Sequence, residues 1–267
     1  MRSQYAKLHD QLGNALFKQP LYLNSSEEDG ALTGDVYALL DYPFGTVRKE
    51  LTNADHWCDV LSLHINVKRC QIVDETPPTI MLNIGKKYDQ PAGGASTLDF
   101  KYRVLSNRPD FMQLALHADK GPYSTSNHRI TVEAIPMEGK TWIHFAYSHS
   151  YGTLAKVALS AYLNTMARNK VGFTLVDQGT EGQPQYIKGV RGMIERNVMR
   201  YYLALDAYLG SLAAPPSEQF EKRIHNWFAA TERYPRQLHE VAQNEYIEMK
   251  RKEFRNQQSP ALANSDR

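Results

Sequence analysis

The side chains best suited to chemistry lie in one short stretch, residues 143–151, where their kinds alternate. One set is Ile143, Phe145, Tyr147, His149 and Tyr151, and the other is His144, Ala146, Ser148 and Ser150. Because successive side chains of a strand point to opposite faces, this alternation predicts a strand with one aromatic face. We expect that face to point inward, so that Tyr147 and His149 meet the polar group of a ligand. The alternative is that His149 and Tyr151 lie half-solvated at the strand end and have no role.

A second pair of polar residues, His64 and Asn66, interrupts an apolar stretch. They alternate with Leu63, Ile65 and Val67, which predicts a strand with the apolar residues on one face. If that face packs beneath neighbouring helices, His64 and Asn66 lie either in water or along the wall of a ligand cavity. Both residues are therefore candidates for ligand contact.

Arg103 is a further candidate, on a strand that also carries charges at Asp99 and Lys101. The three charges share one face, and the pattern favours a solvated face. If the face is interior instead, Arg103 needs a carboxylate or a ligand anion, because an unpaired buried charge is costly. Asp41 is the candidate partner in that case.

Common catalytic and cofactor motifs are absent from the sequence. We find no Walker loop, no G-x-G-x-x-G, no H-E-x-x-H and no G-x-S-x-G. The chain has two cysteines and no C-x-x-C, so it lacks the ligands of a thiolate zinc site. Most cofactor enzymes show at least one such signature. We therefore assign no catalytic residue, no metal and no cofactor from the sequence.

The two cysteines, Cys58 and Cys70, stand at the ends of a short helical pattern and of the strand pattern that follows. Such a pair of elements can fold back and bring the two Cα atoms within bridging range. Two reduced, buried thiols are the equally weighted alternative. The spacing alone leaves both open.

The bulk composition narrows the class of protein. The 267 residues suffice for one large domain or for a domain with an appendage. The 31 Lys and Arg against 29 Asp and Glu leave a net charge of +2, which argues against a nucleic-acid surface. No window approaches 18 uninterrupted apolar residues, so we expect no transmembrane segment. Residues 1–17 lack the apolar core of a signal peptide, which taken literally predicts a cytoplasmic protein.

The middle of the chain is rich in predicted strands separated by Gly, Pro and Asn turns. Short strands at regular spacing with such turns between them predict a curved antiparallel sheet of about seven strands. The strands are expected at Val36–Leu40, Leu63–Ile72, Thr79–Lys86, Thr97–Leu105, Phe111–Ala118, Ser126–Ile135 and Thr141–Tyr151.

Helical periodicity marks both ends of the chain. Helices are expected at Ser3–Lys18, Thr153–Thr165 and Arg191–Leu212, with an amphipathic pair in 217–257 broken near Pro235. Two short strands, at 171–176 and 185–188, are also expected. The predicted organisation is a lead-in over 1–30, a main domain over 31–214, a helical extension over 215–257 and a disordered tail over 258–267.

Residues 34–68 order these elements as strand, two short helices and strand. Pro43 follows the first strand, Phe44, Val47 and Leu51 are spaced as in a short helix, and Trp57 lies on the second helix. This order resembles the opening of the START-like superfamily (SRPBCC, helix-grip, Bet v 1-like), in particular its uncharacterised proteobacterial members. The resemblance implies an α+β fold in which a long C-terminal helix, either 153–165 or 191–212, closes an open sheet.

The resemblance also implies a function, which is to bind or transfer a hydrophobic small molecule, lipids included, in an internal cavity. Loops near Gly93 and Gly121 are the expected lids. One alternative is a cyclase- or aromatase-like enzyme that uses His149, Tyr147 and Asp41 as acid–base groups. Another is an interaction module formed by the C-terminal helices.

The resemblance and the basic residues also bear on the location of the protein and on its contact with membranes. Many START-like proteins are made with an export signal, so the resemblance implies a periplasmic protein if such a signal has been removed, and it favours a Cys58–Cys70 disulfide. Arg196 and Arg200, one helical turn apart, can bind an anionic headgroup, although a surface ion network is favoured. Peripheral contact with acidic lipid is a further alternative. Its candidate residues, for which a solvated helix face is favoured, are Lys250, Arg251, Lys252 and Arg255.

Overall fold

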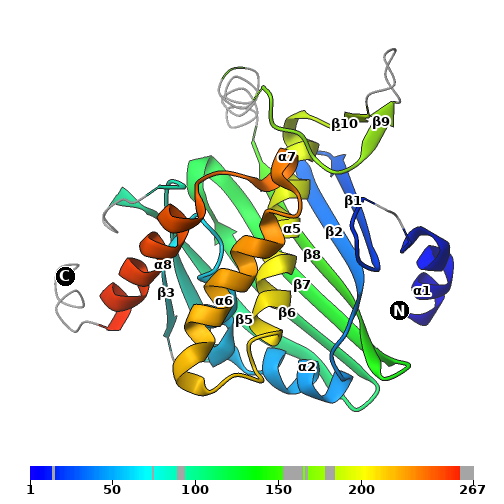
Figure 1. Cartoon of the computed structure of the whole chain (residues 1–267), viewed down its shortest axis with the longest axis horizontal. Coiled ribbons are helices and arrows are strands. Elements are labelled where there is room, and N and C mark those ends of the chain that lie inside the picture. Colours follow the sequence, from blue (N-terminus) through cyan, green and yellow to red (C-terminus); the bar gives the residue numbers. More distant parts are fainter. Residues whose placement is uncertain are drawn as a thin grey trace.

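Eight strands form one antiparallel sheet that curves around a long helix (Figure 1). The structure is a computed structural model and describes residues 1–13, 16–73, 75–88, 94–152, 165, 168–177 and 184–258. The strand order is β1-β2-β8-β7-β6-β5-β4-β3. The strands are β1 Leu21–Glu28, β2 Ala31–Leu40, β3 Val67–Val73, β4 Thr79–Ile84, β5 Ser96–Arg108, β6 Phe111–Lys120, β7 Thr125–Met137 and β8 Lys140–Tyr151.

Strands β2 to β8 and three helices reproduce the expected helix-grip arrangement. The short helices α2 (Phe44–Leu51) and α3 (Trp57–Leu61) follow β2, and the long helix α5 (Gly189–Leu209) follows the last strand of the sheet. Strand β2 pairs directly with β8, so the strands that open and end this unit lie side by side. The α+β helix-grip class predicted from the sequence is therefore confirmed.

Strand β1 is the eighth strand, and it corrects the sequence prediction. The sequence favours a short strand at 21–23 and a solvated turn at 25–30, but β1 pairs with β2 along its whole length, from Leu21 opposite Ala38 to Glu28 opposite Ala31. Only Asp29 and Gly30 form the turn, both with positive φ. Only one face of β1 is buried, so the other positions are polar and the sequence did not indicate a strand over its second half.

Helix α5 is the helix that closes the sheet. It lies against β2 so closely that a Cβ on Gly34 would be 2.9 Å from Cγ1 of Val198. Gly34 thus allows the helix to approach the strand. The other expected helix, 153–165, lies outside the described residues except for Thr165.

Three further helices follow α5: two of them cover α5 on the side away from the sheet, and the third lies beside the first of these and against β3 (Figure 1). They are α6 (Pro216–Thr231), α7 (Pro235–Leu238) and α8 (Gln243–Gln258). The indole of Trp227 donates to the carbonyl of Arg200 at 3.1 Å, and the hydroxyl of Tyr246 donates to the carbonyl of Leu63 at 2.8 Å. The helical extension therefore shares the core of the main domain.

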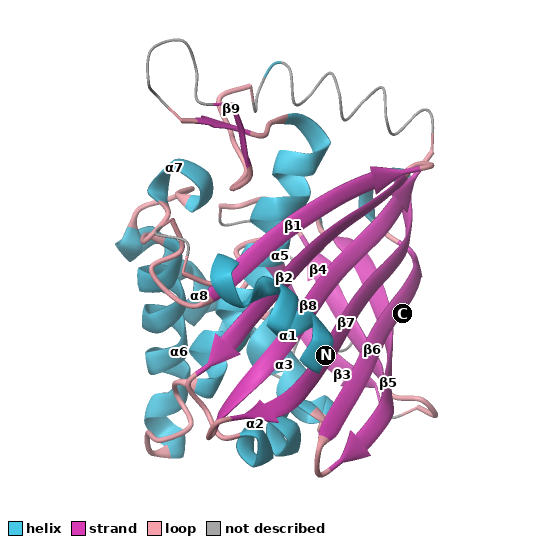
Figure 2. Ribbon diagram, turned by 90° about the vertical axis from the view of Figure 1, so that its right-hand side faces the viewer, coloured by secondary structure: helices cyan, strands magenta, loops and turns pink. Residues whose placement is uncertain are grey.

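The outer face of the sheet carries the N-terminal helix α1 (Arg2–Leu8), as Figure 2 shows. Leu8 and Leu12 pack with Ile135 and Trp142, and the ring of Tyr5 meets Trp142 edge-on at 5.0 Å. The expected helix 3–18 is shorter than predicted, because regular helix ends near Gln11. Both faces of the sheet near β8 are thus covered.

His144, on the outer face of β8, forms a pH-sensitive contact. Its Nε2 lies 2.8 Å from Asp35 Oδ1 and its Nδ1 lies 3.3 Å from Glu133 Oε2. Burial opposes protonation of the ring, but the hydrogen bonds to both carboxylates outweigh it and raise the pKa of His144 above 6.5. The stability from this contact is fully present below the unfolded pKa of about 6.5 and is lost as pH rises through the raised folded value.

We expect His144→Gln to lower the free energy of unfolding by about 1.5 to 3 kcal/mol at pH 5.5 and by less at pH 8.5, because charge-assisted hydrogen bonds are lost. Urea unfolding of both proteins at the two pH values measures this difference. His117→Gln is the matched control, since His117 is half-exposed on the same outer face. Equal losses at the two pH values would contradict the assignment.

Candidate functional site

Five buried side chains form a continuous aromatic cluster between the sheet and α5, which we call the His–Tyr cluster. The rings of His128 and His149 stack with centroids 5.2 Å apart, and Tyr147 lies 5.4 Å from Tyr201. Tyr201 in turn stacks on His64 at 4.7 Å. All five are buried. The aromatic face of β8 therefore points inward, as the alternation predicted.

A bulge in β7 positions His128. The pairing of β7 with β8 shifts between Ser126 and Arg129, and Asn127 has a φ of 51°. A β-bulge inserts a residue and re-aims the neighbouring side chain. The bulge brings His128 beside His149, which lies near the end of β8.

The connection between β6 and β7 closes over the ring of His128. The amide of Gly121 donates to the carbonyl of Thr125, and a Cβ on Gly121 would lie only 2.0 Å from His128 Nε2. Only glycine leaves room for the ring here. Tyr123 and Ser124 adopt left-handed backbone angles, a strain that often marks functional loops. This loop is one of the two expected lids; Gly93, in the other, lies outside the described residues.

The cluster is uncharged at neutral pH. Burial lowers the pKa of His149 to about 4. Burial and the neighbouring His149 lower the pKa of His128 to about 4. Burial also raises the pKa values of Tyr147 and Tyr201 above their usual range. The site is therefore a set of neutral polar groups in apolar surroundings.

One polar atom of the cluster is left without a partner. Nδ1 of His149 is fully buried and makes no hydrogen bond to any described residue. Nδ1 of His128, in contrast, lies 2.9 Å from the hydroxyl of Tyr147, and its Nε2 lies 2.7 Å from Thr125 Oγ1. An unsatisfied buried polar atom costs about 1 to 3 kcal/mol. A polar ligand group at His149 would remove that cost.

His64 is the fifth member of the cluster and Asn66 lies next to it, but the polar atoms of both side chains already have partners within the protein. Residues 62–66 form a turn and not the predicted strand, so His64 turns inward together with Leu63 and Ile65. The ring of His64 donates from Nε2 to Asn197 at 3.0 Å and accepts at Nδ1 from the amide of Asn66. Both ring nitrogens are thus used, and the side chain of Asn66 donates to the carbonyl of Gly85.

Arg103 and Asp41 do not reach the interior, which corrects their prediction as cavity residues. Arg103 is exposed on the outer face of β5, where Asp99 and Lys101 are exposed as well. Asp41 has 85% of its side chain exposed and pairs with Lys140 at 3.2 Å. Tyr102, next to Arg103, points inward instead, as strand alternation requires. The solvated-face interpretation is correct.

The sequence analysis missed Tyr201 and His128 as cluster members. His128 shares its strand face with the buried Ile130, Val132 and Ala134. That alternation was visible in the sequence and could have identified the residue. Tyr201 lies within the helix expected at 191–212, and its contact with Tyr147 depends on how α5 crosses the sheet.

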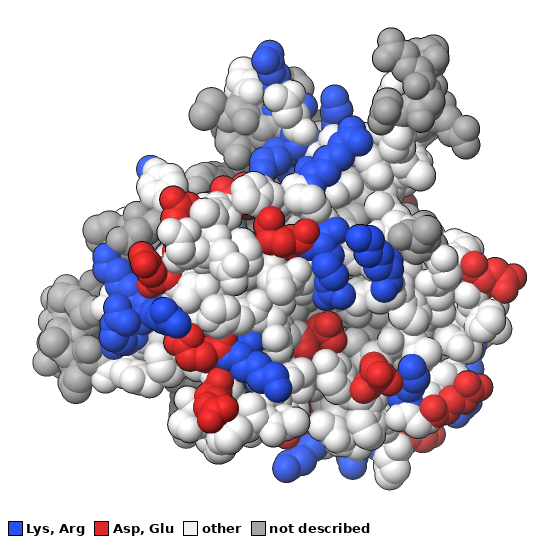
Figure 3. Space-filling model, in the orientation of Figure 1, with Lys and Arg blue, Asp and Glu red and all other residues white. Residues whose placement is uncertain are grey.

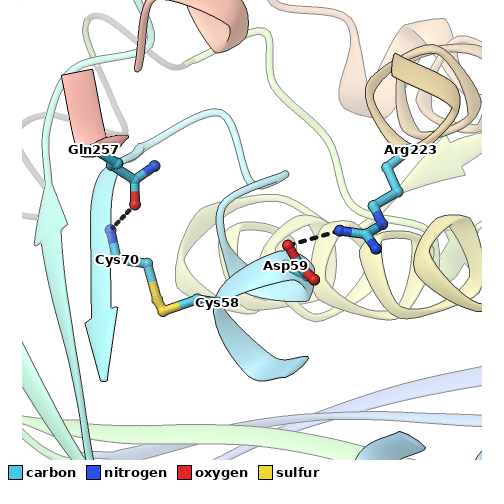
Figure 4. Close-up of a disulfide and its surroundings, with 5 residues drawn as sticks. All are labelled: Cys58, Asp59, Cys70, Arg223 and Gln257. Atoms are coloured by element: carbon cyan, nitrogen blue, oxygen red, sulfur yellow. Dashed lines mark hydrogen bonds and ion pairs between the residues drawn. A yellow bond between two sulfur atoms is a disulfide. The ribbon is translucent and has the colours of Figure 1, made fainter. Parts of the chain in front are cut away.

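Cys58 and Cys70 form a disulfide that joins α3 to the edge strand β3 (Figure 4). Their Cα atoms are 5.4 Å apart. Figure 4 also shows the side chain of Gln257 accepting a hydrogen bond from the amide of Cys70, and Arg223 paired with Asp59 at 2.6 Å. A pocket of about 100 Å³ lies beside this bond, between α3, α6 and α8. The bridged state, one of the two alternatives, is the observed one.

A buried charge cluster surrounds Glu240, which sequence patterns did not indicate. Its carboxylate lies 2.6 Å from Arg200, 2.7 Å from Lys87 and 3.1 Å from Lys170. Arg200 is fully buried, so its expectation as part of a surface network is wrong. Arg196 is buried too and donates to the carbonyl of Val171.

The basic residues near the C-terminus do not form one exposed patch. Lys250 is buried and donates to the carbonyls of His64 and Val67, and Arg251 pairs with Glu221. The face drawn in Figure 3 shows positive and negative side chains interspersed over the helices. None of the described helices is long and apolar enough to cross a membrane.

Comparison with known proteins yields structural likeness only. No family model matches the chain, and no curated protein matches it. Among solved structures, Ara h 8.0201 of the Bet v 1 family has a TM-score of 0.40 at 12% identity, over 68% of this chain and 99% of its own.

Two further solved structures are similar to a smaller part of the chain. Norcoclaurine synthase from Thalictrum flavum has a TM-score of 0.35 at 8% identity, over 54% of this chain and 91% of its own. A conserved protein from Geobacillus kaustophilus has a TM-score of 0.34 at 15% identity, over 51% and 86%. We take no function from these likenesses. The strand order and helix α5 give the chain its START-like, Bet v 1-like fold.

Proposed function

We propose that the protein binds a hydrophobic small molecule between the sheet and α5, with the polar group of that molecule at the His–Tyr cluster. The observation that supports this most directly is the buried, unpartnered Nδ1 of His149. Apolar ligand surface removed from water contributes about 25 cal/mol per Å² before the costs of association. The few polar atoms of the cluster would supply specificity.

Binding is favoured over catalysis by the protonation states of the cluster. General acids and bases work best with pKa values near the operating pH. His128 and His149, with pKa values of about 4, and Tyr147, with a pKa raised well above 10, are poorly matched to proton transfer at neutral pH. The acid–base hypothesis also required Asp41 in the cavity, but the side chain of Asp41 is exposed.

An interaction module formed by the C-terminal helices has less support. An exposed apolar patch on these helices would favour it, but Trp227, Tyr246 and Met249 are buried in the shared core. The exposed large hydrophobic side chains of the described residues lie elsewhere in the chain. They are Tyr88, Val104, Leu105, Tyr123, Leu175 and Val176.

The disulfide supports placing this function in an oxidising compartment. Disulfides persist in secreted and periplasmic proteins and are rare in reducing cytosol. Cys58 and Cys70 are bridged, and the described residues contain no free cysteine. An exported binding protein is therefore the location that we propose.

Mass spectrometry of a native extract tests for the occupant. The full chain is purified from its host under mild conditions and extracted with organic solvent, beside a control protein prepared in the same way. We expect one hydrophobic molecule in near-stoichiometric amount in this extract alone. An empty extract would leave the enzyme alternative better supported than the proposal of a binding protein.

A fluorescent probe tests the site directly. We expect N-phenyl-1-naphthylamine, a neutral dye with apolar rings and one N–H group, to bind saturably. His149→Phe should weaken its binding about tenfold, because it removes the buried nitrogen that can pair with this N–H. His117→Gln, on the outer face, is the control and should bind as the wild type does. Circular dichroism verifies folding. Binding that His149→Phe leaves unchanged would place the site elsewhere.

A further inference from the structure

The hydrogen bonds around Tyr147 have a fixed direction. Thr125 Oγ1 lies 2.5 Å from the carbonyl oxygen of Pro122, which can only accept, so the single hydroxyl proton of Thr125 points there. The same Oγ1 lies 2.7 Å from Nε2 of His128 and must accept from it. Nε2 of His128 therefore carries a proton.

The proton on Nε2 determines the role of the other ring nitrogen. A neutral imidazole carries one proton, so Nδ1 of His128 is bare and accepts from the hydroxyl of Tyr147, 2.9 Å away. Burial and the neighbouring His149 keep His128 neutral. The only proton of Tyr147 is thus committed to His128, and its oxygen can offer a ligand nothing but lone pairs.

We infer that the ligand is a neutral molecule that presents a hydrogen-bond donor, such as a hydroxyl group, to the oxygen of Tyr147. The inference rests on the proposed function and names the class of ligand. A hydroxyl donates one hydrogen bond and accepts others. It therefore also fits the unpartnered Nδ1 of His149, whichever tautomer that ring adopts.

An anionic ligand group fits this place poorly. Among the described residues, the groups that face Tyr147 and His149 are His128, Tyr201 and Tyr151, and none of these three carries a positive charge at neutral pH. The cations Arg200, Lys87 and Lys250 act instead on His64, at the opposite end of the cluster. A carboxylate buried beside Tyr147 would pay its desolvation without a counter-charge.

Nuclear magnetic resonance tests the proton order without any ligand. Long-range ¹H–¹⁵N spectra at pH 7, with His128 assigned from a His128→Gln variant, report which ring nitrogen is protonated. We expect Nε2 of His128 to carry the proton and Nδ1 to be bare. A proton on Nδ1, or on both nitrogens, would reverse the direction at Tyr147 and overturn the inference.

Three molecules with one ring system test the ligand class. Naphthalene, 2-naphthol and 2-naphthoate each compete with bound N-phenyl-1-naphthylamine at pH 7. We expect 2-naphthol to bind at least about tenfold more tightly than the other two. A site that accepts a hydrogen bond from a ligand hydroxyl discriminates against analogues that lack this hydroxyl. Naphthol is less hydrophobic than naphthalene, so apolar burial cannot explain that order.

Two variants assign the preference to Tyr147. Tyr147→Phe should abolish the preference for naphthol and leave the affinity for naphthalene unchanged. Tyr37→Phe, on the outer face of β2, should retain the preference. Equal binding of naphthol and naphthalene to the wild type would refute the hydroxyl inference, and so would tightest binding of naphthoate. In both cases the proposed binding function would stand. Binding of none would refute both.

Discussion

Replacement of Glu240 by Gln is expected to lower the free energy of unfolding by about 3 to 5 kcal/mol, one of the two largest effects that the structure predicts. The carboxylate of Glu240 is the shared partner of Arg200, Lys87 and Lys170. Removing its charge leaves a fully buried guanidinium and two partly buried ammonium groups facing one another. Denaturant unfolding of both proteins at pH 7 measures the loss.

The pH dependence of the wild type gives an independent signature of the same contact. Burial alone would raise the pKa of Glu240, but the charges of Arg200, Lys87 and Lys170 outweigh it and lower the pKa to about 2. The stability from ionised Glu240 is therefore full above the unfolded pKa of about 4.5 and is lost as pH falls toward 2. Glu240→Gln should lack this component of acid sensitivity.

Two further variants keep the Glu240 prediction specific. Glu248→Gln, on the exposed side of α8, should change stability by no more than about 0.5 kcal/mol. Arg200→Met combined with Glu240→Gln should cost less than the sum of the single changes, because the buried guanidinium is gone. Strict additivity would show that Glu240 does not stabilise Arg200, and the charge cluster would then need another explanation.

The arrangement of the sheet could largely be predicted from the sequence. Strand alternation and Gly–Pro turns are local signals, and they located seven strands. Two errors have separate causes. Residues 25–28 were predicted as part of a turn because few of them are buried, and residues 63–66 were predicted as a strand because a short apolar run fits either structure.

The candidate site was only half predictable. Tyr147 and His149 were found because they share a strand face, which is a local pattern. The inward face of His128 follows from the alternation of its strand, but its position beside His149 depends on a bulge at Asn127, and bulges have no reliable local signal. The proton order depends on Thr125 as well, a residue with no conspicuous pattern of its own.

The buried charges were missed because α5 is covered on two sides. An amphipathic pattern assumes one solvated face, and Arg196 and Arg200 were placed on that face. In the structure the sheet packs on one side of α5 and helices α6 and α7 pack on the other, so nearly the whole circumference is buried. Glu195 is buried as well and accepts from Ser25 and the amides of Phe173 and Thr174.

The second large effect concerns the Cys58–Cys70 disulfide, whose removal is expected to lower the free energy of unfolding by about 3 kcal/mol. The bond closes a loop with a sequence separation of 12 residues and restricts the unfolded chain accordingly. It also fastens β3, an edge strand with only one neighbour in the sheet, to α3. We propose the double variant Cys58→Ser with Cys70→Ser, unfolded by denaturant beside the wild type.

Reductant provides the matched control for this prediction. Dithiothreitol should destabilise the wild type by about the same 3 kcal/mol and leave the double serine variant unchanged. Gln257 at the end of α8 accepts a hydrogen bond from the amide of Cys70. Greater mobility of β3 should therefore also weaken the packing of the last turn of α8. Hydrogen exchange would then rise in β3 and in the last turn of α8, while the amides of β7 and β8 around the His–Tyr cluster stay protected. Equal loss of protection across the sheet would show instead that the bond supports the whole fold and not this edge alone.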